Sequence, residues 1–333
     1  MGAGRQLLAP ESMAALRTAG DIGFRPPMLA SRTDRPFSSE HWVFERKLDG
    51  VRAIISRESG QRPKLWSRNQ KSMDASYPEL VAALDERGPD QFIADGEIVA
   101  FDGPVTSFAR LQARIHLTDP AAIEATGVEV QLYLFDLLVL GELDLTRLRL
   151  RDRKRLLHQA FDYGDGLKLS NHRNTDGESY FQLACARGWE GLIAKRANST
   201  YQNRRSSDWR KFKSVRGQEF VIGGFTEPSG SRIGFGALLL GYHADGVLRY
   251  AGKVGTGYDR TMLRRLRRKM DQLETGKSPF ADAVREPGVH WVSPELVAQV
   301  GFTEWTGDGR LRHPRFQGLR DDKAAQDVVR EQG

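Results

Sequence analysis

Lys47 is the residue of this sequence best placed to act as a nucleophile. It follows the apolar run 42–44, which indicates the end of a buried strand, and precedes Gly50, which permits a turn or the close approach of a ligand. Asp49 lies two residues on, so both side chains point to the same face of an extended segment. A partly desolvated lysine loses proton affinity and can attack an electrophile to form a covalent intermediate. A strand-end salt bridge would use the same residue types, so partners elsewhere in the chain must carry the interpretation.

Further residues with suitable chemistry occur in order along the chain. Carboxylates supply the hard oxygen ligands that divalent cations prefer, and lysine and arginine bind phosphate oxygens. These residue types support phosphoryl transfer, in which positioning and charge neutralisation supply most of the catalysis. The set comprises Glu45, Asp49, Arg52, Arg68, Asp95, Glu97, Phe135, Glu190, Lys195, Lys211, Lys213, Arg320, Asp322 and Lys323.

Single members of this set have ordinary structural explanations. Phe135 lies in an apolar run, where a phenylalanine is usually a core residue. Glu97, and still more Asp95, could be a strand-edge carboxylate that pairs with an arginine. Lys211 and Lys213 alternate on a strand, where they could be solvated. Trp209 beside them is expected to pack in the core rather than to contact a ligand. The order of the whole set therefore carries more weight than any one member.

The chain up to residue 214 alternates between strand and helix patterns. Hydrophobic periodicity and the positions of Gly and Pro predict these elements. Strands are expected at 42–47, 51–57, 63–67, 92–101, 128–140 and 192–195, and helices at 11–20, 77–87, 150–161 and 179–187. Pro78 near the start and Gly88 after the end support the helix at 77–87.

The composition shifts near Ser214. Short strands separated by glycines are expected at 218–225, 235–242, 247–254 and 300–306, with a helix over 259–273 between the last two. Many short strands with frequent turns and one helix predict a small β-barrel. The sequence therefore predicts one domain at 1–216 and a second at 217–333.

The helix expected at 259–273 is strongly basic. It contains the run Arg264-Arg265-Leu266-Arg267-Arg268-Lys269. This run could bind DNA phosphates. It could equally be a solvated helix face, because Asp259, Asp271 and Glu274 flank it.

Composition and length exclude several classes of protein. The 333 residues suggest two domains, and no apolar run approaches the roughly 18 residues needed to cross a bilayer. The single cysteine, Cys185, excludes a disulfide framework and a multi-cysteine zinc site, and it is expected to be buried and inert. With no secretory signal at the N-terminus, a cytoplasmic location is the default. The net charge of +7 is compatible with a polyanionic partner such as nucleic acid.

The ordered set resembles the motifs of the covalent nucleotidyltransferases, which comprise ATP-dependent DNA ligases, RNA ligases and mRNA capping enzymes. The chain is most similar to bacterial ATP-dependent DNA ligases, namely the ligase module of the end-joining enzyme and its stand-alone relatives. Segments 24–30, 254–258 and 311–323 add to this likeness, which spans residues 27–323. The resemblance implies an α+β fold. A mixed α/β nucleotidyltransferase domain with ATP-grasp-like antiparallel sheets would precede an OB-fold β-barrel.

The resemblance also implies a reaction. Lys47 would attack the α-phosphorus of ATP and expel pyrophosphate, and Asp49 would assist. The AMP would pass to the 5′-phosphate of a nick, where the 3′-hydroxyl would displace it. Lys47 must be neutral to attack, so Lys195, Lys211 and Lys213 are expected to depress its pKa while they bind phosphate oxygens.

Roles in AMP binding follow from the same resemblance. Glu45, with the adjoining backbone, would face the adenine edge, and Phe135 would stack on the base. Glu97 would hold the ribose hydroxyls. Arg52 and Arg68 would contact ribose and phosphate.

Mg²⁺ or Mn²⁺ is the expected cofactor beside ATP. Glu190, Asp49 and Glu97 are the candidate ligands, with Asp95 as a weaker one. In the C-terminal domain Arg320, Asp322 and Lys323 would orient pyrophosphate during the first step.

The implied partner is nicked duplex DNA, held mainly through phosphates and therefore in a salt-sensitive, largely sequence-independent way. End-joining or repair proteins are further candidate partners, a monomer is expected, and no membrane is involved. The segment before Lys47 is short, so the helical DNA-binding domain of larger ligases is expected to be absent.

Other functions use similar sequences. An RNA ligase or an mRNA guanylyltransferase would use the same lysine chemistry. A non-catalytic nucleic-acid-binding relative is a hypothesis of a different class, although the presence of Lys47, Glu190, Lys211 and Lys213 argues against it. Zinc-dependent and NAD-dependent ligases are disfavoured, because one cysteine cannot build a zinc module.

Overall fold

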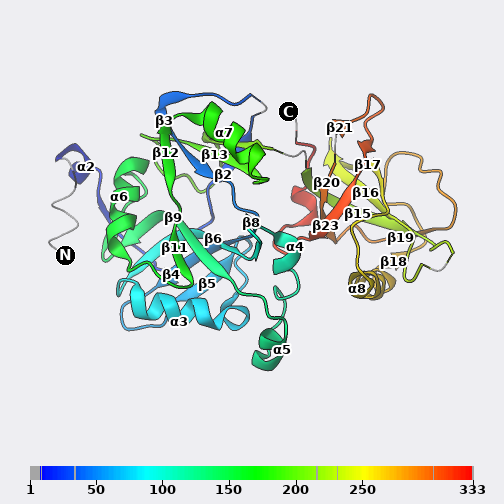
Figure 1. Ribbon diagram of the computed structural model, residues 1–333, viewed down its shortest axis with the longest axis horizontal. Helices are drawn as coiled ribbons and strands as arrows, with labels where there is room; N and C mark the ends of the chain where they lie inside the picture. The colour runs from blue at the N-terminus through cyan, green and yellow to red at the C-terminus, as the bar shows by residue number, and fades with distance from the viewer. Residues whose placement is uncertain are drawn as a thin grey trace. The chain divides into compact units, whose positions relative to one another are not determined.

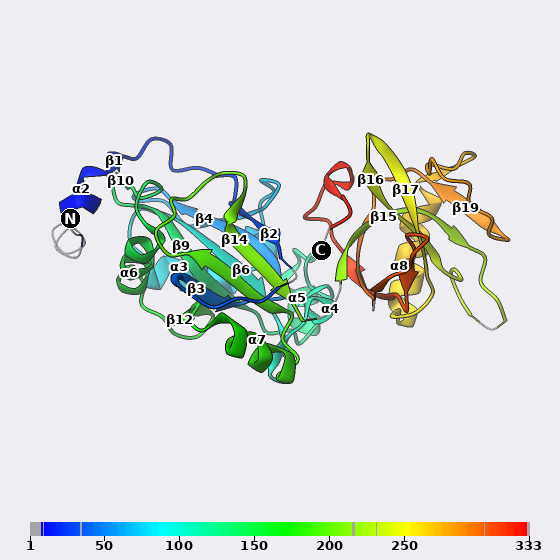
Figure 2. The ribbon, with the colours of Figure 1, turned by 90° about the horizontal axis from the view of Figure 1, so that it is seen from above.

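The computed structural model describes residues 8–331 except residues 9, 34, 215, 216, 231 and 303. The chain divides into two compact units, Met1–Ser214 (unit 1) and Val215–Gln332 (unit 2), and each is described by itself (Figures 1 and 2). In the part of the chain that is described, no helix is both long and apolar enough to cross a membrane.

Unit 1 combines strands from distant parts of the sequence with short helices. Its strands are β1 (Arg17–Thr18), β2 (Leu29–Arg32), β3 (Ser39–Arg46), β4 (Val51–Arg57), β5 (Lys64–Ser67), β6 (Phe92–Val99), β7 (Phe101–Asp102), β8 (Val105–Thr106), β9 (Gln131–Leu140), β10 (Leu143–Asp144), β11 (Leu167–Leu169), β12 (His172–Thr175), β13 (Gly191–Arg196) and β14 (Arg205–Lys213). Its helices are α2 (Pro10–Ala14), the 3₁₀ turn η1 (Asp74–Ser76), α3 (Pro78–Arg87), α4 (Phe108–Leu111), α5 (Pro120–Ala125), α6 (Leu150–Ala160) and α7 (Gly177–Ala186).

Two sheets form the body of unit 1. Sheet 1 has the order β1-β10-β9-β6-β4-β5, with β11 paired to β9, and sheet 2 has the order β12-β3-β13-β14-β2. The pairing is antiparallel except for β11 with β9 and β14 with β2, which agrees with the antiparallel sheets expected from the sequence. Strand β9 is apolar over most of its length because both of its faces are covered, whereas β3 is apolar only at Trp42, Val43 and Phe44.

Three apolar layers hold unit 1 together. Helices α3 and α6 pack their leucines on the outer face of sheet 1, and α7 packs Tyr180 and Ala184 on the outer face of sheet 2 (Figure 1). Between the sheets lies a third cluster, which joins Ile54, Phe135 and Trp209. The inner faces of the two sheets therefore face each other, and polar side chains on them can meet.

The predicted elements of unit 1 mostly agree with those observed, with one clear error. The helix expected at 11–20 ends at Ala14, and Arg17–Thr18 instead form β1 against β10. Pairing with Leu143 and Asp144, far along the chain, overrides the local helical pattern at this place.

Unit 2 is built on short strands and one long helix. Its elements are β15 (Gly217–Thr226), β16 (Leu238–Ala244), β17 (Val247–Val254), α8 (Arg260–Asp271), β18 (Glu274–Thr275), β19 (Val289–Val292), β20 (Val297–Gly301), β21 (Glu304–Trp305), β22 (Leu311–Arg312), β23 (Arg315–Leu319) and the 3₁₀ turn η2 (Ala325–Asp327). The main sheet has the order β17-β16-β15-β19-β18, and β20 joins β15 to β23. Among the described residues these pairings do not close into a ring of strands.

The strand expected at 300–306 is not continuous. Strand β20 ends at Gly301, β21 covers Glu304–Trp305, and residue 303 lies outside the described residues. Strands β19 and β23 were not predicted. Strand β19 pairs with β15 beside β20, and β23 pairs with β20, so these unpredicted strands complete the sheet.

Candidate active site

The register of sheet 2 places the predicted lysines on one face. Residues opposite each other in antiparallel strands project to the same side. Glu45 on β3 therefore shares a row with Ile193 on β13 and Lys211 on β14. The next row toward the end of β3 contains Gly191, whose carbonyl accepts from the backbone N–H of Lys47, and Lys213. Residues from three distant parts of the sequence thus meet on the face that looks toward sheet 1.

Gly191 allows the neighbouring strand to approach closely beside Lys47. Its φ of +142° lies in the region that favours glycine, and an added Cβ would lie 1.9 Å from the carbonyl oxygen of Phe212. Gly50 has the same function after Lys47, because a Cβ there would lie 2.2 Å from the carbonyl oxygen of Ile98. Both glycines therefore allow the backbone to approach closely on either side of the lysine.

Lys47 forms an ion pair with Glu190, in which Nζ donates to Oε2. Burial by itself would lower the pKa of Lys47, but the charges of Glu190, Asp49 and Glu97 outweigh it and raise the pKa. The prediction that neighbouring lysines depress this pKa is therefore wrong. The charges of the three carboxylates act on Lys47 more strongly than those of the neighbouring lysines.

Asp49 forms hydrogen bonds in addition to acting on Lys47 through its charge. The backbone N–H of Asp49 donates to Thr106 Oγ1 at 3.0 Å, and its carboxylate Oδ2 accepts from the backbone N–H of Phe108 at 3.1 Å. Asp49 thus ties the turn after Lys47 to the start of α4.

Glu45 is buried and held by two lysines. Its Oε1 accepts from Lys154 Nζ at 2.7 Å and its Oε2 accepts from Lys195 Nζ at 2.9 Å, while Ser170 Oγ donates to Oε2 at 3.2 Å. Burial alone would raise the pKa of Glu45, but the two lysines hold it below its usual value. For Lys195 burial dominates and lowers the pKa to about 8.

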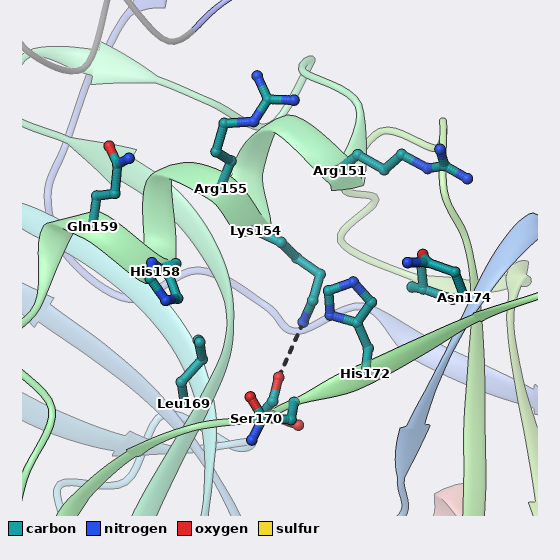
Figure 3. A pocket seen from close by; sticks show the side chains of 11 residues that line it. Arg151, Lys154, Arg155, His158, Gln159, Leu169, Ser170, His172 and Asn174 are labelled. Atoms are coloured by element: carbon teal, nitrogen blue, oxygen red, sulfur yellow. Dashed lines mark hydrogen bonds between the residues drawn. The ribbon is translucent and has the colours of Figure 1, made fainter. Parts of the chain in front are cut away.

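Lys154 is a residue that the motif set missed. Its side chain, 6% exposed, also approaches the carbonyl oxygens of Phe135 and Ser170 at 3.5 and 3.4 Å. Figure 3 shows it pointing from α6 toward Ser170 and His172, beside a cavity of about 420 Å³. Lys154 joins sheet 2 to strand β9 of sheet 1. The available signal was its place in α6, where Lys154 occupies the apolar stripe of Leu150 and Leu157.

Arg52 forms a second buried network. Its Nε and Nη2 donate to the two carboxylate oxygens of Asp95, and Tyr201 Oη donates to Oδ2 at 2.6 Å. Tyr201 Oη also accepts from the backbone N–H of Met28 at 2.9 Å. Asp95 has no exposed surface and its oxygens are engaged, so its weaker candidacy as a metal ligand is not supported. The charge of Asp95 outweighs burial and raises the pKa of Arg52.

Phe135 lies at the centre of the inner cluster with 8% exposure. Lys195 Nζ lies 4.2 Å and the Arg52 guanidinium 4.6 Å from its ring centre, and Trp209 packs edge-on at 6.1 Å. Cation–π contacts of this kind stabilise the buried cations. Trp209, 2% exposed, is a packing residue as predicted.

The remaining predicted residues of unit 1 lie near this centre or on its rim. Glu97 on β6 is opposite Arg52 on β4, and its charge acts on both Arg52 and Lys47. Arg68 lies, half-buried, in the turn after β5, whose Ser67 is opposite Ala53. Lys211 and Lys213 are half-buried on the inner face of β14.

The predicted residues of unit 2 form a cluster of their own. Arg320 donates from Nε and Nη2 to the two carboxylate oxygens of Asp322, both at 2.8 Å. Lys323 Nζ donates to Glu219 Oε2 at 3.0 Å, which ties the end of the chain to β15.

Cys185 is exposed on α7, so the prediction that it is buried is wrong. Position 185 faces away from sheet 2, whereas Ala184 beside it is buried against the sheet. Helix rotation, not residue type, determines which of the two is covered.

The carboxylates around Lys47 suit a hard divalent cation. Among the described residues, no group of three or more His, Cys, Asp or Glu side chains is arranged as a ready metal site. Mg²⁺ usually binds through one or two carboxylates together with substrate phosphates, so a ready site is not required. Glu190, with the charges of Asp49 and Glu97 acting on the same lysine, fits that mode of binding.

Two facing sheets with Lys47 paired to Glu190, followed by a separate unit of short strands, agree with a nucleotidyltransferase-type ligase fold. Matches to two family models give a more specific assignment. Residues 27–213 match the ATP dependent DNA ligase domain, and residues 231–323 match the ATP dependent DNA ligase C terminal region. The chain belongs to the ATP-dependent DNA ligase family.

Individual relatives agree with this assignment. The multifunctional non-homologous end joining DNA repair protein LigD of Mycobacterium tuberculosis is 37% identical over 312 residues, which cover 92% of this chain and 40% of the relative. A probable DNA ligase of Dictyoglomus thermophilum is 30% identical, covering 86% of this chain and 54% of that protein. The chain therefore spans about 40% of the length of LigD.

A solved structure supports the fold. Mycobacterial DNA ligase D in complex with ATP and MES shares 35% identity and a TM-score of 0.65, covering 92% of this chain and 98% of that chain. The predicted fold class, a nucleotidyltransferase domain followed by an OB-fold domain, is confirmed by this likeness and by the two family models.

Proposed function

We propose that this chain is an ATP-dependent DNA ligase that seals nicks in duplex DNA through a lysyl-AMP at Lys47 and a DNA-adenylate. The observation that carries the proposal is the ion pair of Lys47 with Glu190 on a sheet face that also carries Lys195, Lys211 and Lys213. Family membership, the name of the LigD relatives and the ATP in the solved relative support it.

The first step forms a P–N bond between Lys47 Nζ and the α-phosphorus of ATP, while the bond from that phosphorus to the pyrophosphate oxygen breaks. Lys47 must first lose a proton, and Glu190, its hydrogen-bond partner, is the nearest acceptor. Lys211 and Lys213 would bind the phosphate oxygens as charge develops. In the later steps the adenylate passes to the 5′-phosphate of the nick, and the 3′-hydroxyl displaces AMP.

We propose that Glu190, Asp49 and Glu97 hold Mg²⁺ or Mn²⁺ with the phosphates of ATP. The bound cation would neutralise the charge of the leaving pyrophosphate. In the free protein Glu190 orients the Lys47 amine. If the Glu190 carboxylate bound the cation instead, it would stabilise the protonated form of Lys47 less.

The nucleotide pocket is proposed around the inner faces of the two sheets. Glu45, fixed by Lys154 and Lys195, supports the strand that would face the adenine edge, and Phe135 would stack on the base. Arg52, Arg68 and Glu97 line the side proposed for ribose and phosphate, and Arg320, Asp322 and Lys323 are proposed to orient pyrophosphate. Because Arg52 and Lys195 lie over the Phe135 ring, at least one of these cations must move for the base to stack there.

The end-joining name of the LigD relatives favours a role in joining DNA ends with repair proteins as partners. We further propose that the chain acts as a monomer, because the large hydrophobic side chains exposed among the described residues, Met13, Val247 and Val329, are too few to form a large apolar interface. We further propose a cytoplasmic location, because the DNA of bacteria, from which the LigD relatives come, lies in the cytoplasm.

Labelling with α-labelled nucleotide tests the proposal. Wild type and Lys47→Ala are incubated with labelled ATP or GTP and Mg²⁺ or Mn²⁺, and the labelled protein is chased with nicked duplex DNA. The proposal requires label from ATP that needs Lys47 and leaves the protein when nicked DNA is added. Label from GTP would indicate a capping enzyme, and label that only nicked RNA discharges would indicate an RNA ligase. No label from either nucleotide, in protein shown by mass to carry no AMP, would refute the catalytic proposal.

A further inference from the structure

Helix α8 of unit 2 carries a row of arginines that have no partner among the residues that the structure describes. Arg260, Arg264 and Arg268 are exposed and lie at positions i, i+4 and i+8, so they form one stripe about 12 Å long at 1.5 Å rise per residue. Within the described part of the chain, none of the three makes a hydrogen bond, an ion pair or a ring contact. We call these three residues the arginine stripe.

The opposite side of α8 fixes the orientation of the stripe. Leu263, Leu266 and Met270 are buried in the core of unit 2, beneath the main sheet that Figure 1 shows. The helix therefore cannot rotate to bury its arginines. The stripe faces solvent because the apolar side must face the core.

The acidic residues that flank α8 are engaged elsewhere. Asp259 caps the helix, where its Oδ1 accepts from the backbone N–H of Met262 at 2.7 Å. Asp271 accepts from Arg267 at 2.6 Å, and Glu274 lies 2.6 Å from His290 Nδ1. The explanation of a solvated face balanced by these three acids therefore does not hold.

Two other basic residues of α8, Arg267 and Lys269, do contact the protein. Arg267 pairs with Asp271, donates to the carbonyl oxygen of Gly234 at 2.9 Å and covers the Phe225 ring at 4.7 Å. Lys269 lies 3.5 Å from Asp321. The stripe has none of these contacts, and like charges four residues apart destabilise a helix. Folding alone therefore gives no reason for the stripe.

We propose that Arg260, Arg264 and Arg268 bind the phosphate backbone of the duplex that flanks the nick, through charge and without reading bases. The inference rests on the proposed ligase function and assigns that substrate a specific surface of unit 2. Each DNA strand presents one phosphate charge about every 3.4 Å of helix axis, so a stripe about 12 Å long can reach several phosphates. Guanidinium groups suit such contacts because they bind phosphate oxygens in pairs.

Salt dependence of DNA binding tests the proposal. The triple variant Arg260→Gln, Arg264→Gln, Arg268→Gln is compared with wild type for affinity to a labelled nicked duplex over a series of salt concentrations, without ATP. The matched control removes three positive charges of unit 2 that lie off the stripe, Arg265→Gln, Lys277→Gln and Arg285→Gln. Lysyl-AMP formation and thermal unfolding of all three proteins are measured in parallel.

Each phosphate contact contributes about 0.9 to the slope of log affinity against log salt, so the stripe variant should lose about 2 to 3 from that slope. The control should keep the wild-type slope, and all three proteins should form lysyl-AMP equally. An unchanged slope in the stripe variant overturns the proposal, as does an equal loss in the control, which would indicate diffuse attraction to net charge. Failure of wild type to form lysyl-AMP would instead refute the proposed function, because the binding slopes do not depend on that step.

Discussion

Substitution of Lys154 by methionine should destabilise unit 1 selectively. Methionine keeps most of the side-chain length but removes the ammonium that binds Glu45 Oε1 at 2.7 Å. Glu45 is 2% exposed, so water cannot replace the lost partner. The variant therefore leaves a buried carboxylate with Lys195 as its remaining cation.

The size of the effect follows from that loss. Removal of one partner of a buried ion pair costs about 3–5 kcal/mol. Because Lys195 still neutralises one oxygen of Glu45, we expect the lower end, about 3 kcal/mol. In a domain the size of unit 1 this corresponds to a fall of roughly 6–12 °C in the midpoint of thermal unfolding.

The effect should also depend on pH. In the intact protein the pKa of Glu45 is lowered, so the stability that it contributes is present above its unfolded pKa and is lost as pH falls through the lower folded value. In the variant, burial acts with one lysine fewer, so the pKa of Glu45 rises and protonation relieves the penalty. The difference in stability between wild type and variant should therefore shrink from about pH 7 to about pH 5.

Denaturant unfolding of wild type, Lys154→Met, Glu45→Gln and the double variant measures these free energies. Arg155→Met is the control, because Arg155 is exposed on the same helix and points away from Ser170 in Figure 3. It should change stability by less than about 0.5 kcal/mol. The reasoning would be refuted if Lys154→Met behaved like Arg155→Met, or if the two substitutions at Glu45 and Lys154 were additive, since residues in direct contact should couple.

Three further outcomes are expected. Gly191→Ala should unfold more readily than wild type and lose lysyl-AMP formation, because the new Cβ would meet the Phe212 carbonyl oxygen at 1.9 Å; normal labelling by this variant would contradict the geometry. Removal of divalent cations by a chelator should abolish labelling of Lys47, and readdition of the cations should restore it. Labelling in the presence of chelator would argue against the proposed metal. His290 has a raised pKa, chiefly through its hydrogen bond to Glu274, so its stabilising charge is fully present below about pH 6.5 and is lost as pH rises through the higher folded value. His290→Ala should therefore cost more stability near pH 6 than near pH 9, and equal costs at both pH values would show that the charge contributes nothing.

Local patterns were sufficient for most elements that carry the site. The strand at 51–57, the helix at 77–87 and the strand at 247–254 were predicted within a residue of the observed bounds. Their periodicity and their Gly and Pro boundaries are properties of neighbouring residues, so no distant contact is needed to recognise them. The helix expected at 11–20, which failed, is an element whose second half pairs with a strand more than a hundred residues away.

The state of the reactive lysine could not be predicted from neighbouring residues. Lys47 meets Glu190, which lies 143 positions along the chain, and this contact reverses the expected direction of its pKa shift. For Asp95 the sequence left open an arginine partner or a metal ion, and the fold supplies Arg52 and Tyr201 as its partners. Lys154 lies in no motif and gains its importance only from Glu45, 109 positions away.

The sequence by itself determined the class of chemistry, the order of the reactive residues and the family, because residue type and spacing carry that information. Only the tertiary structure decided which charges meet. Charge interactions in a protein interior depend on separations of a few ångströms, and folding sets these between residues that are far apart in the chain. That assembly sets the partners of Glu45, the burial of Asp95, the exposure of Cys185 and the lack of partners, among the described residues, for three arginines of α8.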